Sequence, residues 1–218
     1  MMINSKVAVI IVNWKKYDIT SSCIESILNS TNSNFKIILV DNESDNKKVK
    51  NFKYRNEIKI IQNKKNEGFS KANNIGIDYA LKNNYDYTIL INNDTIVEKN
   101  LIEVLLKTAQ AKNFSVVQPL ILNHNGKEIW NAGGRINYFF GNFITRKKLG
   151  NSLNSSLELT EWFTGCCCLF KTKIFKDIGK LDERFFAYYE DVDFSLRLKK
   201  YGYKIGFTSK THIYHYES

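Results

Sequence analysis

Three scarcities narrow the class of this 218-residue chain. Proline occurs once, at Pro119, and the apolar share of 43% and charged share of 25% are ordinary for a folded protein, which excludes collagen-like and disordered chains. Four cysteines without paired C-x-x-C spacing exclude a disulfide scaffold and make a zinc site unexpected. No stretch approaches the roughly 18 consecutive apolar residues of a membrane span. We therefore expect one soluble domain, 1–218, with buried and reduced thiols.

The amino terminus, MMINSKVAVIIVNW, has one lysine and a short apolar run. It lacks the small-residue cleavage site of a signal peptide, so we predict a buried strand and a cytoplasmic protein. The chain carries 32 basic and 22 acidic residues, a net charge of +10. Such a surface favours nucleic acids, anionic lipid headgroups or phosphorylated small molecules. The abundance of lysine and asparagine also has a bland explanation, compositional drift in an AT-rich genome, and both explanations stay open.

The first half of the chain alternates strand and helix signals. Continuous β-branched runs predict strands at 7–12, 37–40, 58–61 and 87–91, and apolar spacing of three or four residues predicts helices at 19–28 (capped by Asp18 or Thr20), 70–81 and 97–111. Such alternation implies parallel strands joined by right-handed crossovers. We therefore predict an α/β fold.

Polar residues follow each of these predicted strands, at Asn13, Asp41–Asn42, Asn63 and Asn92–Asp94. Each group taken alone is typical of a turn. In parallel sheets, however, ligands bind beyond the carboxyl ends of the strands. The four groups together predict one polar site along one edge of the sheet.

The second half has a different pattern. We expect a strand at 116–122 that Pro119 interrupts or confines to an edge. Asn125-Gly126 indicates a hairpin, and the weakly patterned residues 136–160 indicate a mobile loop over an acceptor site. The remaining predicted elements are a buried strand at 166–170, a short helix near Ile174, and an amphipathic helix at 190–201 with Val192, Leu196 and Leu198 on its apolar side.

Carboxylates mark two places where chemistry is expected. Asp94 at the sheet edge can bind a hard divalent cation that keeps phosphates as partners, although a helix N-cap explains it equally well. Glu190, Asp191 and Asp193 stand at a helix start, where the dipole favours anions. The aromatic residues just before them predict a walled pocket, in which a carboxylate can serve as a general base.

Six segments, in order along the chain, carry a family resemblance. VIIVNW, VDNESD, NEGFSKANNIG, INNDT, WFTGCCCLF and FFAYYEDVDFSLRLKKYGYKI resemble the family 2 glycosyltransferases, in particular the bacterial rhamnosyltransferase-like branch. The resemblance covers about 6–218. It implies a GT-A fold, with a Rossmann-like, mostly parallel central sheet flanked by helices. It further implies a nucleotide-sugar-binding half up to about residue 113, and an acceptor-binding and catalytic half from about 114 to 218.

The resemblance also assigns expected roles to single residues. It implies donor contacts at Asn13, Asp41, Asn42, Gly68, Asn73, Asn92, Asn93 and Asp94. Asp41 would recognise the nucleotide base, and a side chain at position 68 would crowd the diphosphate. Asp94 matches the last aspartate of a D-x-D metal motif, and Asn92 replaces the first.

The same resemblance assigns the metal and the catalytic base. His215 matches a histidine that is sometimes a second ligand of Mn²⁺ or Mg²⁺, whereas His212 has no counterpart. Asp191 matches the catalytic base, with Glu190 beside it. Asp193 and Arg197 match a D-x-x-x-R pattern that we expect to be partly structural.

These assignments predict an inverting transfer from a UDP- or dTDP-linked sugar to a glycan or lipid-linked acceptor in cell-surface polysaccharide synthesis. The basic surface would contact the inner face of the plasma membrane. We expect no nucleic acid partner, because the aromatic residues cluster beside carboxylates rather than among basic residues. An inactive nucleotide-sugar-binding homologue stays an alternative. A nucleotidyltransferase is the other, although Asn13-Trp14-Lys15 stands where its glycine-rich phosphate loop would follow the first strand.

Overall fold

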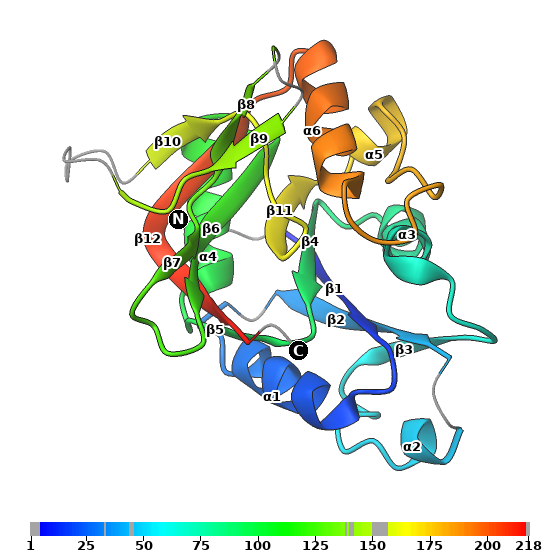
Figure 1. The fold of residues 1–218 in the computed structure, drawn as a ribbon. Helices are drawn as coiled ribbons and strands as arrows, with labels where there is room; N and C mark the ends of the chain where they lie inside the picture. The colour runs from blue at the N-terminus through cyan, green and yellow to red at the C-terminus, as the bar shows by residue number, and fades with distance from the viewer. Residues whose placement is uncertain are drawn as a thin grey trace.

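The computed structural model describes residues 5–32, 34–43, 46–137, 139, 142–149 and 157–216. Among these, ten strands form one sheet: β1 (Val7–Asn13), β2 (Phe35–Asn42), β3 (Lys59–Asn63), β4 (Tyr87–Asn92), β5 (Thr95–Val97), β6 (Val116–Asn123), β7 (Ile129–Asn131), β10 (Leu157–Thr160), β11 (Cys167–Lys171) and β12 (Ile205–His215). The order across the sheet is β10-β12-β6-β11-β4-β1-β2-β3, with β5 beside β12 and β7 beside β6 (Figure 1). A separate hairpin joins β8 (Gly134–Asn137) to β9 (Asn142–Thr145).

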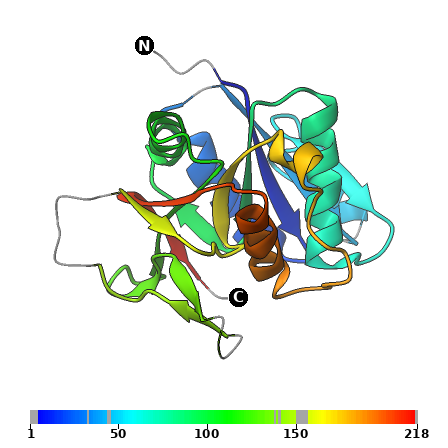
Figure 2. The same cartoon turned by 90° about the horizontal axis from the view of Figure 1, so that it is seen from above.

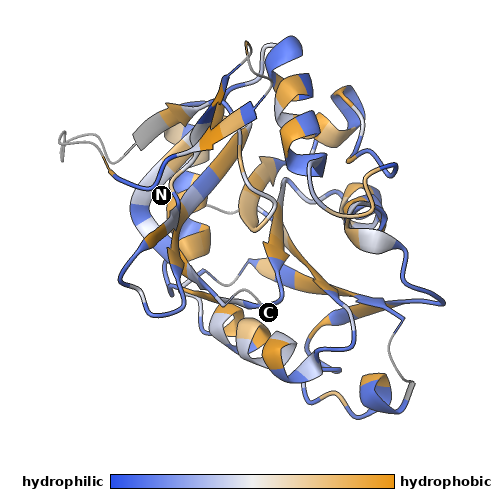
Figure 3. Ribbon diagram, viewed as in Figure 1, coloured by the Kyte–Doolittle hydropathy of each residue, from blue (hydrophilic) through white to orange (hydrophobic). Residues whose placement is uncertain are grey.

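Helices cover both faces of this sheet (Figure 2). They are α1 (Tyr17–Leu28), α2 (Asn46–Lys50), α3 (Gly68–Lys82), α4 (Leu101–Ala111), α5 (Ile174–Asp177) and α6 (Glu190–Lys200). Alternate residues of β1 face opposite sides: Val7, Val9 and Ile11 pack with α1 and α4, whereas Ala8 and Ile10 pack with α3, α5 and α6. The central strands are accordingly apolar along nearly their whole length (Figure 3).

Strand pairing confirms the mostly parallel α/β sheet. β1 pairs in parallel with β2 and β4, and β2 pairs in parallel with β3. β11 is antiparallel to both β4 and β6. The carboxyl ends of β1, β2, β3 and β4 therefore meet along one edge of the sheet, as the strand–helix alternation predicts.

The consecutive cysteines divide between the two sides of β11, as adjacent residues of a strand must. Cys167 packs in the core on the side of α1 and α4, and Cys168 packs in the core on the side of α3 and α6. All four cysteines are buried, and none forms a disulfide bond in the described part of the chain. Burial raises the pKa of Cys23 to about 12. The expectation that the thiols are buried is confirmed.

Two predicted helix starts are wrong. α1 begins at Tyr17, and Lys16 precedes it without a side-chain cap, so Asp18 and Thr20 lie inside the first turn rather than capping it. α4 begins at Leu101 rather than near Val97. Residues 95–97 form β5 instead, because β12 passes beside them and pairs antiparallel with them.

Pro119 does not interrupt β6 or confine it to an edge. β6 runs unbroken from Val116 to Asn123 and lies inside the sheet. Its neighbour β12 pairs in parallel with it but changes register between Thr208, opposite Pro119, and His212. This irregularity falls where proline has no N–H to offer the ladder, so the partner strand absorbs the defect.

The prediction of a loop at 136–160 is wrong for the part of that segment that the structure describes. β9 and the end of β8 form a hairpin there, and β10 pairs with β12. Residues 138, 140–141 and 150–156 lie outside the described residues. The apolar face of α6 is also corrected: Phe194 and Leu198 are fully buried, whereas Leu196 is 41% exposed. No helix of the described part of the chain is long and apolar enough to cross a membrane.

Candidate active site

Hydrogen bonds join the carboxyl ends of β1, β2 and β4. The Asn13 amide donates to Asp41 Oδ1 over 3.1 Å, and the Tyr17 hydroxyl donates to the same oxygen over 2.8 Å. The Thr20 hydroxyl donates to Asn13 Oδ1, and the Asn93 amide donates to Thr20. This network confirms the predicted polar edge. Asp41 is 0% exposed within it, so its carboxylate helps to hold the edge together.

Asn42 ties the ends of β2 and β3 to the start of α3. Its Oδ1 accepts from the Asn63 amide and from the backbone N–H of Glu67. Its own amide donates to Asn66 Oδ1 over 2.6 Å. The loop before α3 is thereby fixed to the sheet edge.

Gly68 and Asn73 lie where α3 meets the segment before α6. Gly68 has φ +80°, and a Cβ there would come within 2.7 Å of the ring and the carbonyl oxygen of Phe186. Phe186 therefore leaves no room for a side chain at position 68, whether or not a diphosphate is bound there. The Phe69 N–H donates to the Phe186 carbonyl over 2.6 Å, and the Asn73 amide donates to Phe69 O within α3.

A cavity of about 900 Å³ lies against the same edge of the sheet. Among the residues predicted for the site, five line it: Asn92, Asp94, Glu190, Asp191 and His215. The others, Asn13, Asp41, Asn42, Gly68, Asn73 and Asn93, are not among its described lining residues. The cavity thus brings together residues that are far apart in the chain, from β4, α6 and the end of β12.

Asp94 and His215 both line the cavity, and their side chains point toward each other. Asp94 Oδ1 lies 3.2 Å from His215 Nε2, and both side chains are buried. β5 pairs with the end of β12 so that His215 lies opposite Thr95, and the Tyr216 N–H donates to Asp94 O. Trp130 packs edge-on against the imidazole, with 4.6 Å between ring centroids.

This pair fits a divalent cation. Carboxylate oxygen and imidazole nitrogen are both suitable donors, and Asn92 Oδ1, in the same lining, is buried with no hydrogen-bond partner among the described residues. Residues 5–216, outside the undescribed gaps, contain no cluster of three or more histidine, cysteine or acidic side chains suited to a metal. The chain would thus supply few ligands and leave the remaining positions to water and phosphate oxygens, as Mg²⁺ commonly requires.

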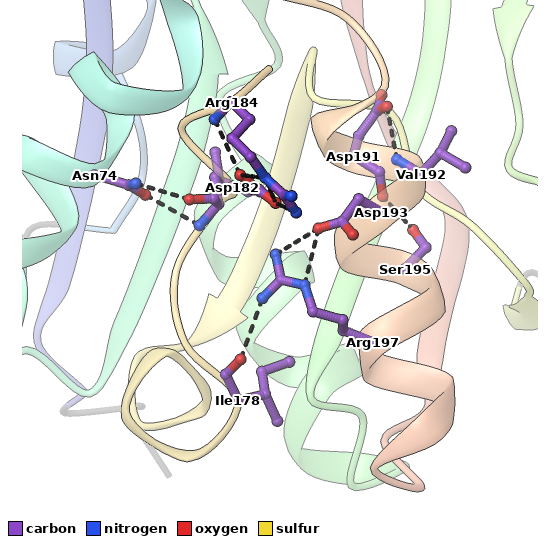
Figure 4. Close-up of polar contacts among 10 residues, drawn as sticks. Asn74, Ile178, Asp182, Arg184, Asp191, Val192, Asp193, Ser195 and Arg197 are labelled. Carbon is purple, nitrogen blue, oxygen red and sulfur yellow. Dashed lines mark hydrogen bonds and ion pairs between the residues drawn. The ribbon is translucent and has the colours of Figure 1, made fainter. Parts of the chain in front are cut away.

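Two adjacent carboxylates begin α6 and differ in their surroundings. Asp191 Oδ2 accepts from the Gly165 N–H over 2.9 Å. Its Oδ1 accepts from the Val192 N–H over 2.8 Å (Figure 4). Burial raises the pKa of Asp191, and these two amides oppose that shift. Glu190 is 5% exposed, and its Oε2 has no hydrogen-bond partner among the described residues. Burial, followed by the charge of Asp191, raises the pKa of Glu190 to about 7.

Arg197 clamps α6 to the segment that precedes it (Figure 4). Its guanidinium pairs with Asp193 at 2.7 Å and donates to the Ile178 carbonyl over 3.1 Å. Farther along that segment, the Asn74 side chain of α3 bonds to the backbone of Leu181. These contacts give the D-x-x-x-R pattern a structural role: they hold in place the chain that leads to Glu190 and Asp191.

Aromatic side chains form a wall of the cavity; the sequence predicted such a wall from the aromatic residues just before Glu190, but not the contribution of Trp130, Phe143 and Trp162. This aromatic wall consists of Trp130, Phe143, Trp162, Tyr188 and Tyr189. The Phe143 ring packs against Trp162 and Tyr189, at centroid distances of 5.1 and 5.7 Å. The aromatic residues within the polar segment 136–160 were the available signal, but the apparent lack of pattern there concealed the hairpin that presents Phe143.

A model of glycosyl transferase family 2 matches residues 8–179, most of the chain. This chain belongs to glycosyl transferase family 2. The expected family is therefore confirmed, and so is the GT-A fold that the solved structures below show.

Two curated relatives show the range of the similarity. A low-salt glycan biosynthesis hexosyltransferase of Haloferax volcanii is 27% identical over 200 residues, covering 91% of this chain and 63% of the relative. The rhamnosyltransferase WbbL of Escherichia coli is 24% identical, covering 96% of this chain and 83% of the relative. The chain thus spans somewhat less than two thirds of the Haloferax protein.

Two solved glycosyltransferase structures share the fold. GalNAc-T7, crystallised with UDP, GalNAc and Mn²⁺, superposes with a TM-score of 0.78 at 16% identity, covering 97% of this chain and 44% of that one. TarS 1-349 of S. aureus superposes with a TM-score of 0.70 at 16% identity, covering 97% of this chain and 60% of that one. At this identity the likeness shows the fold alone.

Replacing Glu190 by glutamine tests the buried carboxyl group. Its folded pKa of about 7 lies above the usual 4.5, so the folded state holds the proton more tightly than the unfolded state does. The stability that this contributes is complete below pH 4.5 and is lost as the pH rises through 7. The effect of Glu190→Gln on the free energy of unfolding should therefore differ between the two pH values. We expect it to be more favourable at pH 8 than at pH 4, by on the order of 2–3 kcal/mol.

Denaturant unfolding at the two pH values measures this difference. Glu57→Gln, at an exposed position, is the matched control and should show no such dependence. An equal effect of Glu190→Gln at pH 4 and pH 8 would contradict the assigned pKa.

Proposed function

We propose that this chain transfers a sugar, with inversion, from a UDP- or dTDP-linked donor to a hydroxyl group of a glycan or lipid-linked acceptor, in cell-surface polysaccharide synthesis. One observation carries the proposal: the Asp94–His215 pair and the Glu190–Asp191 pair line the same cavity of about 900 Å³. The first pair suits a metal-bound diphosphate, and the second suits removal of a proton. Family membership and the names of the relatives support the reaction class.

Asp191 is the residue that we assign as general base. Its carboxylate lines the cavity and is held by the N–H groups of Gly165 and Val192, which fix its orientation. As the acceptor oxygen attacks the anomeric carbon, the hydroxyl proton passes to Asp191. The bond from that carbon to the diphosphate breaks on the opposite side, and the nucleoside diphosphate leaves with the electron pair.

Asp94 and His215 would hold a divalent cation, Mn²⁺ or Mg²⁺, with Asn92 beside them. When bound, such an ion acts as a Lewis acid that stabilises charge on the departing diphosphate. The presence of UDP and Mn²⁺ together in the GalNAc-T7 crystal supports this donor chemistry. The hydrogen-bonded edge formed by Asn13, Asp41, Asn42 and Asn93 would flank the nucleotide, and α3 from Gly68 to Asn73 would line the donor.

Asp191→Asn tests the base. The amide keeps the size of the side chain but accepts no proton, so transfer should slow by about 10²–10⁴-fold while nucleotide binding is retained. Sugar transfer, measured as release of nucleoside diphosphate, and nucleotide affinity are compared with those of Asp18→Asn, an exposed aspartate on α1. Normal turnover by Asp191→Asn would refute the role. Release of inorganic pyrophosphate by the wild type would instead identify a nucleotidyltransferase.

Thermal unfolding with nucleotides tests the donor site and its metal. UDP, dTDP, GDP and CMP are each added with and without Mn²⁺, and a nucleotide at 100 times its Kd should stabilise by about 2.7 kcal/mol. We expect UDP or dTDP to stabilise the wild type more with Mn²⁺, and Asp94→Asn to lose the metal-dependent part. Nucleotide stabilisation that ignores both Mn²⁺ and Asp94→Asn would refute the metal site, and no stabilisation by any nucleotide would count against the donor site.

We place this reaction at the cytoplasmic face of the plasma membrane, where the net charge of +10 would attract anionic lipid. The chain should sediment with phosphatidylserine vesicles at low salt and dissociate as salt screens the attraction. Phosphatidylcholine vesicles are the control. Equal recovery with both lipids at low salt would refute membrane contact through charge.

A further inference from the structure

Two side chains of the aromatic wall are exposed to solvent, so they are not part of the hydrophobic core. Tyr188 is 80% exposed and Tyr189 is 59% exposed, although both line the cavity. Both have φ of +69°, a left-handed conformation that costs free energy in residues other than glycine. Two consecutive aromatic side chains are thus held at the mouth of the cavity by an unfavourable backbone. This arrangement points to a ligand that the rings contact.

Rings from separate segments meet in this wall. Phe143 comes from β9, and Trp162 from the segment between β10 and β11. Tyr189 immediately precedes α6. Phe143 contacts both of the other rings, at centroid distances of 5.1 and 5.7 Å. The three rings therefore form one continuous apolar surface directly beside the first residue of α6.

That first residue, Glu190, supplies a polar group at the edge of the wall. It is only 5% exposed, and its Oε2 has no hydrogen-bond partner among the described residues. Buried polar atoms in folded proteins almost always have a partner, so this oxygen lacks one that a ligand can provide. Both oxygens of Asp191, by contrast, already accept backbone N–H groups. Glu190 Oε2 therefore has its whole hydrogen-bonding capacity open to a ligand, whereas each Asp191 oxygen keeps one lone pair for the acceptor hydroxyl.

A pyranose ring has the matching chemistry, because its faces carry C–H groups and its rim carries hydroxyls. An alkyl chain would suit the rings but leave Glu190 without a partner. Next to the aromatic wall, the adjacent carboxyl groups of Glu190 and Asp191 would disfavour a phosphate group, although Lys147 also lines the cavity. Concave sites of this kind combine aromatic walls with a few placed polar groups.

We propose that the aromatic wall and Glu190 form the binding site for the acceptor sugar, with a pyranose ring packed on Phe143 and Tyr189 and a hydroxyl bound to Glu190 Oε2. The hydroxyl next to it on the ring then faces Asp191. This inference rests on the proposed function for the reaction, and it names a saccharide ring, rather than a lipid or a polyol phosphate, as the part of the acceptor that the chain recognises.

Saturation-transfer NMR on the full chain, without nucleotide, tests this site. The probes are methyl pyranosides of glucose, mannose, rhamnose and N-acetylglucosamine. We expect saturation at the ring C–H protons of at least one probe, and apparent Kd values about three- to tenfold higher in Phe143→Ala and Tyr189→Ala. Tyr201→Ala is the matched control: Tyr201 is also 59% exposed and stands at the other end of α6, and its removal should leave binding unchanged.

Glu190→Met tests the hydrogen bond, since methionine has a similar length and no carboxyl group; we expect weaker binding than in the wild type. If this variant does not fold, monodeoxy forms of the bound pyranoside test the same contact in the wild type, and one of them should bind more weakly than the parent sugar. Undiminished binding in Glu190→Met, or equal binding of all deoxy sugars, would overturn the role of Glu190.

Any one of three results would overturn the site as a whole. The first is that no pyranoside binds, and the second is that Phe143→Ala and Tyr189→Ala bind the pyranoside as the wild type does. The third is competitive displacement of the pyranoside by UDP, which would make the wall a nucleotide site. These results are distinct from failure of the proposed function. Pyranoside binding in a chain that no nucleotide stabilises would refute the donor site and support the sugar site. Nucleotide stabilisation without pyranoside binding would support the donor site and refute the sugar site.

Discussion

The turn at Gly165–Cys166 connects the two halves of the site through two hydrogen bonds, one from its N–H to a side chain and one to its carbonyl. The Gly165 N–H donates to Asp191 Oδ2, and the neighbouring Cys166 carbonyl accepts from the Asn92 N–H over 2.9 Å. One side of the turn therefore holds the start of α6, and the other holds the end of β4. Because β11 continues from this turn and pairs with β4, the position of the carboxylates relative to Asp94 follows from the register of the sheet.

A second connection supports the same geometry from the opposite side. Phe186 lies against Gly68 and accepts a hydrogen bond from Phe69, so the segment before α6 rests on the start of α3. Arg197 and Asn74 anchor the earlier part of that segment. A substitution at Gly68 would therefore disturb the approach to Glu190 and Asp191 as well as the donor side, and loss of activity alone would not identify which of the two had failed.

The carboxylate pair shows how burial gives two similar groups different properties. Asp191 receives two amide hydrogen bonds, which favour its charged form, whereas Glu190 has none at Oε2 and lies beside a negative charge. Burial, followed by the charge of Asp191, raises the pKa of Glu190 to about 7. An unsatisfied carboxyl group also lowers stability, a cost that is common at sites built for a ligand.

The sequence by itself determined the four parallel strands β1, β2, β3 and β4 and the edge at which the site forms. β-branched runs specify the strands, and parallel pairing brings the polar residues after β1, β2, β3 and β4 to one edge, so the neighbourhood of Asn13, Asp41, Asn42 and Asp94 was predictable. The opposite facing of Cys167 and Cys168 follows equally from the two-residue period of a strand.

Only the tertiary structure decided what each of these residues contacts. β5 replaces the predicted start of α4 because β12, far later in the chain, pairs with it. Phe143 joins Trp162 and Tyr189 because a hairpin brings it across the cavity. The environment of Glu190 depends on burial by segments distant in sequence. The sequence pattern of one segment indicates its backbone conformation and the side of the strand or helix on which each residue lies. The contacts described here depend on how separate segments pack against one another, which the pattern of one segment does not encode.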